Sequence, residues 1–450
     1  MDKGITEKRQ FPRVNVTFPI RITPEFLGET VDLSQGGLGF ALEKPLLLSK
    51  VHAKIELSPE ESIDTELKII WNKRLIKEGR FTYGACFVRL GEKDLEMLGK
   101  VLIKLYADST LDKFDDAKIK EKIWSFWNKD FKEYLDKLIK LSNALDNREI
   151  DIEKGLKVVA DISDIILRKG DELEVYLNDK IVTKKIKRVF RELCGPWVYR
   201  SKIVKHAFEK PRGYPGDYQL LEIIYDDKPI SDYIGYCYDR YFLNNAYAVG
   251  VRNRKDKMRD ILNNFINSSD DAVINILNVA CGSCREIKEL IIDKKLSSFK
   301  KINFNLVDQD EKALEFCKGF LKDNQTFSYK FLPHNIREYI KDSNKYRAIL
   351  GKQNLIYSIC LADYLPDRVL INLLLFCYSL LVPQGKLIIA HKDIKRYKPL
   401  APDWACDWTF YPRDQEYLVR MINESGIKGF DLKIERDFSG VILFLTLTKA

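Results

Sequence analysis

Two stretches of this 450-residue chain combine residue types that bind nucleotide-like ligands. The first lies near the N-terminus, where Arg9 and Arg13 are four residues apart and a glycine-containing turn follows. That turn contains Asp32, Ser34 and Gly36-Gly37. Arginines bind phosphate oxygens through paired hydrogen bonds and stack on flat bases. Glycines let a ligand approach the backbone closely. This pattern predicts a site for an anionic ligand that carries bases.

The second stretch is Ile276–Leu290, which indicates a buried strand, a turn of small residues and an amphipathic helix. The turn is Ala280-Cys281-Gly282-Ser283-Cys284. A strand followed by such a turn and a helix presents backbone N–H groups to a nucleotide-like ligand. Asp308 ends the next predicted strand, where a carboxylate can accept hydrogen bonds from two ribose hydroxyls.

The small-residue turn resembles motif I of the class I S-adenosylmethionine (SAM) methyltransferases. Asn278 stands at that family's acidic position, Ala280 and Cys284 stand at two of its glycine positions, and Gly282 is kept. The Val382-Pro383-Gln384-Gly385 turn and the strand after it resemble a later motif of the same family. The resemblance implies SAM as cofactor. The cofactor contacts that it implies are Asn278, Ala280, Cys281, Gly282, Ser283, Asp308, Gln309, Asn335, Ile336 and Ser358.

Asn335 would lie near the adenine amine and Ile336 would pack on the ring. Arg252 and Arg254 could hold the SAM carboxylate or an acidic substrate, or they could form a solvated helix face. Methyl transfer needs a positioned nucleophile and excluded water. Candidates on the substrate side are His391, Asp363 and Tyr364, although a structural role for His391 is equally compatible with the sequence.

The N-terminal pattern resembles a PilZ domain, the bacterial receptor for cyclic di-GMP. Arg9 and Arg13 match its RxxxR motif, and Asp32, Ser34 and Gly37 match its D/NxSxxG motif. Tyr83–Phe87 matches a late strand of that family. The resemblance implies cyclic di-GMP binding by Arg9, Arg13, Asp32, Ser34, Gly36 and Gly37. Short strands between glycine and proline residues predict a small antiparallel barrel here.

A narrower resemblance covers residues from about Trp197 to the C-terminus. It rests on the Arg212-Gly213-Tyr214-Pro215-Gly216-Asp217-Tyr218 block and on Arg252-Asn253-Arg254. These motifs resemble the "extracellular factor" 3-hydroxypalmitic acid methyl ester biosynthesis family. The resemblance implies a methyl acceptor that is a small or fatty-acid-like acid.

We therefore expect four parts. Residues 1–108 form the PilZ barrel, 109–195 a helical connector, and 196–270 a helical and aromatic extension that caps the SAM pocket. Residues 271–450 form an α/β doubly wound, Rossmann-like methyltransferase core.

Composition limits the partners. The formal charge is +9 and favours anionic ligands, but no basic run is dense enough to predict nucleic-acid binding. No apolar run is long enough to span a bilayer, and the N-terminus has no signal-peptide pattern, so we expect a cytoplasmic bacterial protein. A homodimer is compatible with the sequence.

The nine cysteines show no metal-ligand spacing, and we expect no metal. Cys281 and Cys284 form a CxxC pair that could be redox-active or could simply be two reduced thiols.

Two functions remain open from the sequence. The first is a cyclic di-GMP-responsive methyltransferase. The second is a cyclic di-GMP receptor whose methyltransferase-like half binds SAM or a partner without turnover.

Overall fold

The computed structural model describes residues 13–23, 25–75, 79–112, 114–293, 300–321 and 327–450. The chain forms two compact units. The first unit contains the residues up to Ser201 together with Ser231–Tyr238 and Trp404–Asp407. The second unit contains Lys202–Ile230, Asp239–Asp403 and Trp408–Ala450. The domain boundaries that the sequence suggested at 108, 195 and 270 stay predictions.

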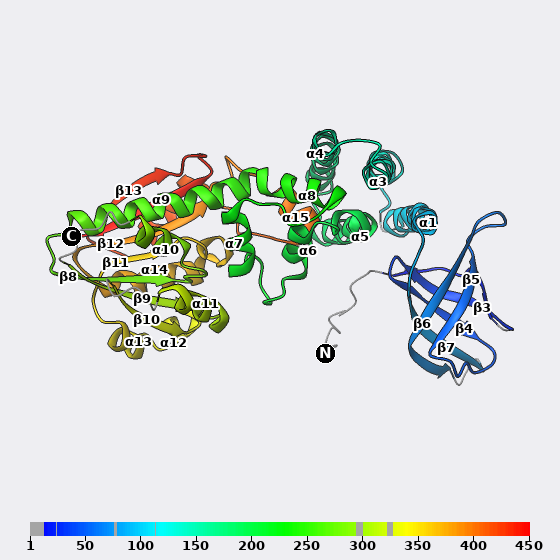
Figure 1. Cartoon of the computed structure of the whole chain (residues 1–450), viewed down its shortest axis with the longest axis horizontal. Coiled ribbons are helices and arrows are strands. Elements are labelled where there is room, and N and C mark those ends of the chain that lie inside the picture. The colour runs from blue at the N-terminus through cyan, green and yellow to red at the C-terminus, as the bar shows by residue number, and fades with distance from the viewer. Residues whose placement is uncertain (1–12, 24, 76–78, 113, 294–299, 322–326) are drawn as a thin grey trace. The chain divides into compact units, whose positions relative to one another are not determined.

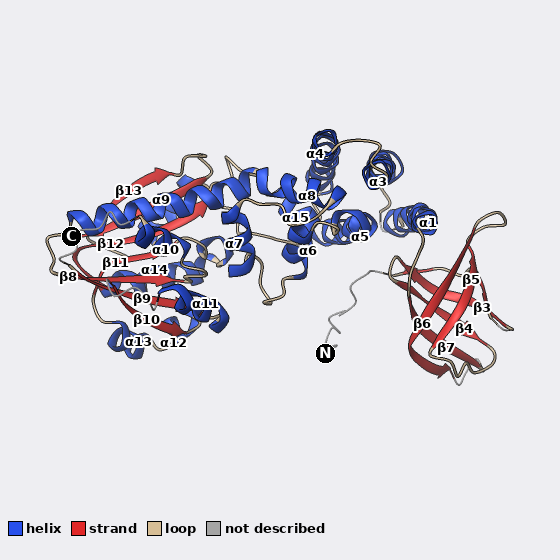
Figure 2. Cartoon of the chain, in the orientation of Figure 1, coloured by secondary structure: helices blue, strands red, loops and turns tan. Residues whose placement is uncertain are grey.

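The first unit begins with an antiparallel barrel (Figures 1 and 2). The strand order is β1-β3-β2-β5-β6-β7-β4, and an additional pairing of β3 with β4 closes the sheet. The strands are β1 (Val14–Asn15), β2 (Pro19–Ile22), β3 (Phe26–Ser34), β4 (Gly37–Leu42), β5 (Lys50–Glu56), β6 (Ser62–Leu75) and β7 (Arg80–Phe87). The barrel prediction is confirmed.

Alternation of side chains accounts for the barrel core. In β5, Val51, Ala53 and Ile55 are buried, while the residues between them face solvent. A strand turns successive side chains to opposite faces, so this pattern buries one face only. Strands β1 and β2 are separate, because residues 16–18 lie between them outside regular structure.

Helices complete the first unit. They are α1 (Glu92–Leu111), α2 (Ala117–Ser125), a π-helical turn (Phe126–Phe131), α3 (Lys132–Asp146), α4 (Ile152–Leu177) and α5 (Lys180–Val198). Helix α5 continues through Gly195 and Pro196. Pro196 has no N–H to donate to the carbonyl four residues earlier, and the helix ends two residues after it, at Val198.

The second unit is built on a seven-stranded sheet in the order β10-β9-β8-β11-β12-β14-β13 (Figure 2). Strands β8 to β12 pair in parallel, and β14 pairs antiparallel with both β12 and β13. The strands are β8 (Val273–Val279), β9 (Lys301–Asp308), β10 (Phe327–Pro333), β11 (Gln353–Ser358), β12 (Leu381–Lys392), β13 (Phe430–Arg436) and β14 (Ile442–Lys449). The prediction of a doubly wound α/β sheet is confirmed.

Helices cover both faces of this sheet. Side chains of α9 (Ala246–Ser268), α10 (Arg285–Ile292) and α11 (Glu311–Leu321) pack into one apolar core. Side chains of α12 (Ile336–Lys341), α13 (Ser343–Leu350), α14 (Asp367–Leu380) and α16 (Gln415–Glu424) pack into the other. The remaining helices with residues in this unit are α6 (Lys202–Glu209), α7 (Tyr218–Asp226), α8 (Tyr233–Asn244) and α15 (Leu400–Cys406). Aspartates begin two of these helices: Asp217 caps α7, and the Asp310 side chain accepts the Lys312 N–H at the start of α11.

Among the described residues, no helix combines the length and apolar character that crossing a membrane requires.

Candidate nucleotide and cofactor sites

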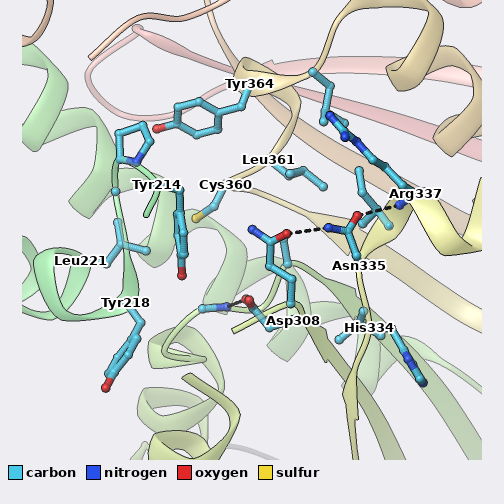
Figure 3. Close-up of a pocket in the computed structure, with 18 residues that line it drawn as sticks. Tyr214, Tyr218, Leu221, Asp308, His334, Asn335, Arg337, Cys360, Leu361 and Tyr364 are labelled. Atoms are coloured by element: carbon cyan, nitrogen blue, oxygen red, sulfur yellow. Dashed lines mark hydrogen bonds between the residues drawn. The ribbon is translucent and has the colours of Figure 1, made fainter. Parts of the chain in front are cut away.

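A cavity of about 490 Å³ opens in the second unit at the carboxyl ends of β8, β9, β10 and β11. The strand order reverses between β8 and β11, and open parallel sheets bind ligands at such a reversal. The volume is within the range of small-molecule and cofactor sites. Figure 3 shows the lining side chains. They are Tyr214, Pro215, Gly216, Tyr218, Leu221, Ala280, Gly282, Val307, Asp308, Gln309, His334, Asn335, Ile336, Arg337, Cys360, Leu361, Tyr364 and Leu365.

Asp308 ends β9 and is almost fully buried. One carboxylate oxygen accepts the Gly282 N–H at 2.9 Å, and the other accepts the Asp310 N–H at 2.9 Å. Burial raises the pKa of Asp308, while these two hydrogen bonds act in the opposite direction. Among the described residues, no cation forms an ion pair with this carboxylate. Each oxygen keeps a lone pair, so the group can accept further hydrogen bonds from a ligand.

The turn after β8 has an unusual backbone. Ala280, Gly282 and Cys284 have φ values of 58°, 54° and 49°. Left-handed conformations cost little for glycine but strain other residues. The turn keeps this shape because two hydrogen bonds hold it against the end of β9. The Cys281 N–H donates to the Val307 carbonyl, and the Gly282 N–H donates to Asp308.

An aromatic loop closes one side of the cavity. Arg212 forms two hydrogen bonds with the Asp310 carboxylate, one of them at 2.8 Å from Nε to Oδ2. The Tyr214 hydroxyl donates to the same carboxylate at 3.1 Å. Hydrogen bonds from Arg212 hold the pKa of Asp310 below its usual range. The loop is therefore fastened next to Asp308, and Tyr214 and Tyr218 face the cavity (Figure 3).

Gly216 lets this loop pass close to its neighbours. Its φ is 71°, and a Cβ there would lie 2.9 Å from the Trp408 ring and 3.3 Å from the Tyr364 hydroxyl. Trp408 Nε1 donates to that hydroxyl at 2.9 Å. A side chain at position 216 would disturb the wall that Tyr364 forms.

Polar side chains lie at the opposite edge. Asn335 Nδ2 donates to Gln309 Oε1 at 2.8 Å, and Asn335 Oδ1 caps α12 by accepting the Arg337 N–H (Figure 3). Ile336 lines the cavity beside them. The structure thus brings together six of the predicted cofactor residues: Ala280, Gly282, Asp308, Gln309, Asn335 and Ile336.

The other predicted cofactor residues do not line the cavity. Asn278 is buried and donates to Glu286 and Tyr357, and Ser358 donates to the Val279 carbonyl. Arg252 donates to the Leu243 carbonyl. Cys281 and Ser283 are buried within the turn.

Arg254 is 3% exposed and lies next to the cavity wall. Its Nη2 donates to the sulfur of Cys360 at 3.0 Å, and Cys360 lines the cavity. Within the part of the chain that the structure describes, its Nε has no hydrogen-bond partner. A buried guanidinium that donates to a thiol and has a further N–H without a partner is suited to an anionic group of a ligand.

Of the predicted catalytic residues, Tyr364 lines the cavity, whereas Asp363 and His391 do not. Asp363 pairs with Lys392 at 2.8 Å in the protein interior. Burial opposes its ionisation, but the charge of Lys392 and the hydrogen bonds from its ammonium and backbone N–H outweigh burial and keep the pKa of Asp363 low. Burial lowers the pKa of Lys392 to about 8.

Both ring nitrogens of His391 have partners. Nδ1 lies 2.6 Å from the Lys392 carbonyl oxygen, and Nε2 lies 3.0 Å from Arg413 Nη1. The carbonyl can only accept and the guanidinium can only donate, which assigns a neutral ring with its proton on Nδ1. This arrangement leaves neither nitrogen free to move a proton to or from a substrate.

In the first unit, Arg13 and Asp32 form the centre of the predicted nucleotide site. Arg13 Nη1 lies 2.6 Å from Asp32 Oδ1, and the same oxygen accepts the Gly39 N–H at 2.6 Å. The buried Ser34 hydroxyl donates to the Gly37 carbonyl. A Cβ on Gly37 would lie 2.1 Å from the Ala85 carbonyl oxygen, so only glycine fits there. Gly36 accepts the Phe87 N–H, and Arg9 lies outside the described residues.

The same loop contacts helix α5. The Gln35 N–H donates to Glu192 at 2.8 Å, and the Tyr106 hydroxyl of α1 donates to the other oxygen of Glu192 at 2.8 Å. Glu192 is 3% exposed. Burial raises the pKa of Glu192 to about 8, although both hydrogen bonds act to lower it. A buried carboxyl group therefore connects the predicted nucleotide loop to two helices.

Sequence reasoning missed the cavity residues His334 and Cys360. Each follows a parallel strand, β10 and β11, and the carboxyl ends of such strands meet at one edge of the sheet. That rule was the signal that could have identified them.

The comparisons with known proteins agree with the N-terminal assignment. Residues 7–104 match the family described as PilZ domain, so the chain carries a PilZ domain at its N-terminus. No curated protein matches the sequence.

Among solved structures, the chain is similar to a DUF574 family protein from Streptomyces avermitilis, with 13% identity, a TM-score of 0.38 and coverage of 50% of this chain and 96% of that one. It is also similar to magnesium protoporphyrin IX methyltransferase from Synechocystis with bound S-adenosylhomocysteine, with 10% identity, a TM-score of 0.33 and coverage of 46% and 88%. A third similarity is to the Bacillus subtilis inhibitor of motility, with 19% identity, a TM-score of 0.19 and coverage of 20% and 47%. These similarities are too distant to assign a function.

Proposed function

We propose that this chain is a SAM-dependent methyltransferase that responds to cyclic di-GMP and acts on a small or lipid-like acid. The observation that carries the proposal is Asp308. Its buried carboxylate stands beside the turn at the switch point of the sheet, oriented by two backbone N–H groups. Two vicinal hydroxyls of a ribose match its remaining lone pairs.

The rest of the cavity suits the other parts of SAM. Asn335 and Ile336 offer an amide and an apolar surface to a base. Arg254 offers a buried positive charge behind Cys360, which suits the methionine carboxylate or the carboxylate of an acidic acceptor. A carboxylate acceptor attacks the sulfonium methyl group without losing a proton, so the engaged state of His391 is no obstacle.

The PilZ domain supplies the regulatory ligand. Arg13 and Asp32 present a charged pair to the phosphates and guanines of cyclic di-GMP, and Ser34 fixes the loop between them. The link from Gln35 to Glu192 gives ligand binding a route to α5 within the first unit. The specific relationship to the "extracellular factor" family stays a prediction.

A receptor without turnover is the second candidate, and Asn278 favours it. At the position where the methyltransferase motif has an acid, this amide donates to Glu286 and Tyr357 and does not reach the cavity.

Turnover separates the two candidates. The full-length protein is incubated with SAM and a panel of short hydroxy acids and long-chain hydroxy fatty acids, with and without cyclic di-GMP. The methyltransferase proposal predicts S-adenosylhomocysteine together with a methyl ester that mass spectrometry detects. SAM binding without any methylated product would favour the receptor, and no SAM binding would contradict the methyltransferase.

A further inference from the structure

Three cysteines meet at the small-residue turn, two of them from the turn itself and one from a later helix. Cys281 and Cys284 belong to the turn, and Cys317 lies on α11. Their three sulfur atoms all lie within 4.8 Å of one another. The side chains are 7%, 0% and 0% exposed.

A fourth potential ligand atom lies in the same place. The Gly282 carbonyl oxygen is 3.2 Å from the Cys317 sulfur and 3.9 Å from the Cys281 sulfur. Tetrahedral Zn²⁺ has Zn–S bonds of about 2.3 Å and Zn–O bonds of about 2.1 Å, which gives S–O edges of roughly 3.6 Å and S–S edges of roughly 3.8 Å. The two observed sulfur–oxygen distances, 3.2 Å and 3.9 Å, lie on either side of the ideal S–O edge of roughly 3.6 Å.

We propose that Cys281, Cys284 and Cys317, together with the Gly282 carbonyl, form a binding site for Zn²⁺. The inference does not depend on the proposed function. Binding requires no oxidant: one Zn²⁺ replaces three thiol protons, which leave to solvent, and forms three Zn–S bonds and one Zn–O bond. Thiolates select soft or borderline cations, and the carbonyl oxygen favours Zn²⁺ over Cu⁺.

Electrostatics around the cluster is compatible with a metal. A cation at the centre would stabilise all three thiolates at once. Cys284 is also the N-cap residue of α10, where the helix dipole favours negative charge.

The metal would fix the ligand-binding turn. Gly282 carries both the proposed ligand oxygen and the N–H that bonds to Asp308, and it lines the cavity. Coordination of its carbonyl would fix the Gly282–Ser283 peptide, and coordination of the Cys281 sulfur would anchor the residue before it, whose peptide with Gly282 carries that N–H. The proposed zinc site is therefore structural, because it would hold the backbone of the turn that lines the cavity.

Metal analysis tests the proposal. The full-length protein is purified without a histidine tag or chelator and analysed by mass spectrometry for metals. We expect about one zinc per chain in the wild type, and a loss of at least about fivefold in Cys317→Ser. Cys377→Ser is the matched control, because Cys377 is a buried cysteine of α14 outside the cluster, and it should keep its zinc. Wild-type protein without zinc that also fails to take up added Zn²⁺ or Co²⁺ would overturn the proposal, as would equal zinc in Cys317→Ser.

A second measurement needs no variant. The wild type is alkylated under anaerobic conditions with and without zinc removal, and the modified cysteines are mapped by peptide mass spectrometry. Zinc should protect Cys281, Cys284 and Cys317 from alkylation and leave the reactivity of the half-buried Cys86 unchanged. Absence of metal-dependent protection, or a disulfide among the three before any oxidant is added, would contradict the site.

Discussion

Each unit places an aspartate where a glycine N–H donates to it, but the two carboxylates differ in their charge balance. Asp32 in the barrel accepts the Gly39 N–H and is paired with Arg13 at 2.6 Å. Asp308 in the α/β unit accepts the Gly282 N–H and is paired with no cation among the described residues. In the first site the carboxylate is already paired with a cation, whereas the carboxylate of the second site has no cation paired with it among the described residues.

This difference suits different ligands. A nucleotide with two phosphates and two guanines needs cations for the phosphates and an acceptor for the N–H groups of the bases. A cofactor ribose needs only an acceptor for its hydroxyls, and a nearby cation would compete for the carboxylate. Similar local geometry therefore supports a charged-pair site in one unit and a hydroxyl site in the other.

The largest expected effect comes from removing the cation of the charged pair. Arg13→Ala should weaken cyclic di-GMP binding at least about 30-fold, because charge-assisted hydrogen bonds contribute about 1.5–3 kcal/mol each. Isothermal titration calorimetry measures the affinity. Arg21→Ala is the control, since Arg21 is an exposed arginine of β2 whose ion pair with Glu56 is long at 3.6 Å. Equal loss in both variants would mean that overall charge, and not this site, determines affinity.

The sequence predicted the parts of both sites that depend on local pattern. Asp308 ends a strand, and Gly282 and Asn335 follow strands, within a strand–turn–helix pattern, so their positions could be predicted without tertiary information. His391 lies near the end of β12, but Arg413, which engages its ring, is 22 residues further along the chain. The spacing of residues in the sequence does not indicate that Arg413 contacts His391.

Other long-range contacts were equally invisible. Cys317 joins the cysteines of the turn only because α11 packs beside it, and Glu192 reaches the PilZ loop across 157 residues of sequence. Both depend on the tertiary fold, which residue spacing does not encode.

Glu192 gives a second prediction, which concerns the connection of the PilZ loop to α5. Its pKa is 4.5 in an ordinary environment and about 8 when folded. Between these values the folded state binds more protons, so stability should fall as pH rises from about 5 to 8, by on the order of a few kcal/mol. Glu192→Gln has the same shape and no charge, and should flatten this slope.

Thermal unfolding at several pH values measures the effect. The exposed Glu153 supplies the control variant Glu153→Gln, which should keep the wild-type slope. A wild-type melting temperature that stays constant or rises across this pH range would show that Glu192 does not control the contact.

The smallest effect concerns the loop over the hydroxyl site. Tyr214→Phe removes the hydrogen bond to Asp310 and should weaken SAM binding about twofold to tenfold, the range for one neutral donor. Tyr218→Phe is the matched control, because no hydrogen bond of its hydroxyl is present in the described part of the chain. If both variants bind SAM like the wild type, Arg212 alone fastens the loop.

The most direct test compares both ligands on two variants. SAM and cyclic di-GMP are each titrated calorimetrically into wild-type, Arg13→Ala and Asp308→Ala proteins, with circular dichroism to confirm folding. Asp308→Ala should weaken SAM binding by about 1–3 kcal/mol and leave cyclic di-GMP binding unchanged, since it removes the acceptor for the ribose hydroxyls. Arg13→Ala should show the reverse. Unchanged SAM affinity in a folded Asp308→Ala protein, or a wild type that binds no SAM, would contradict the assignment of the cavity.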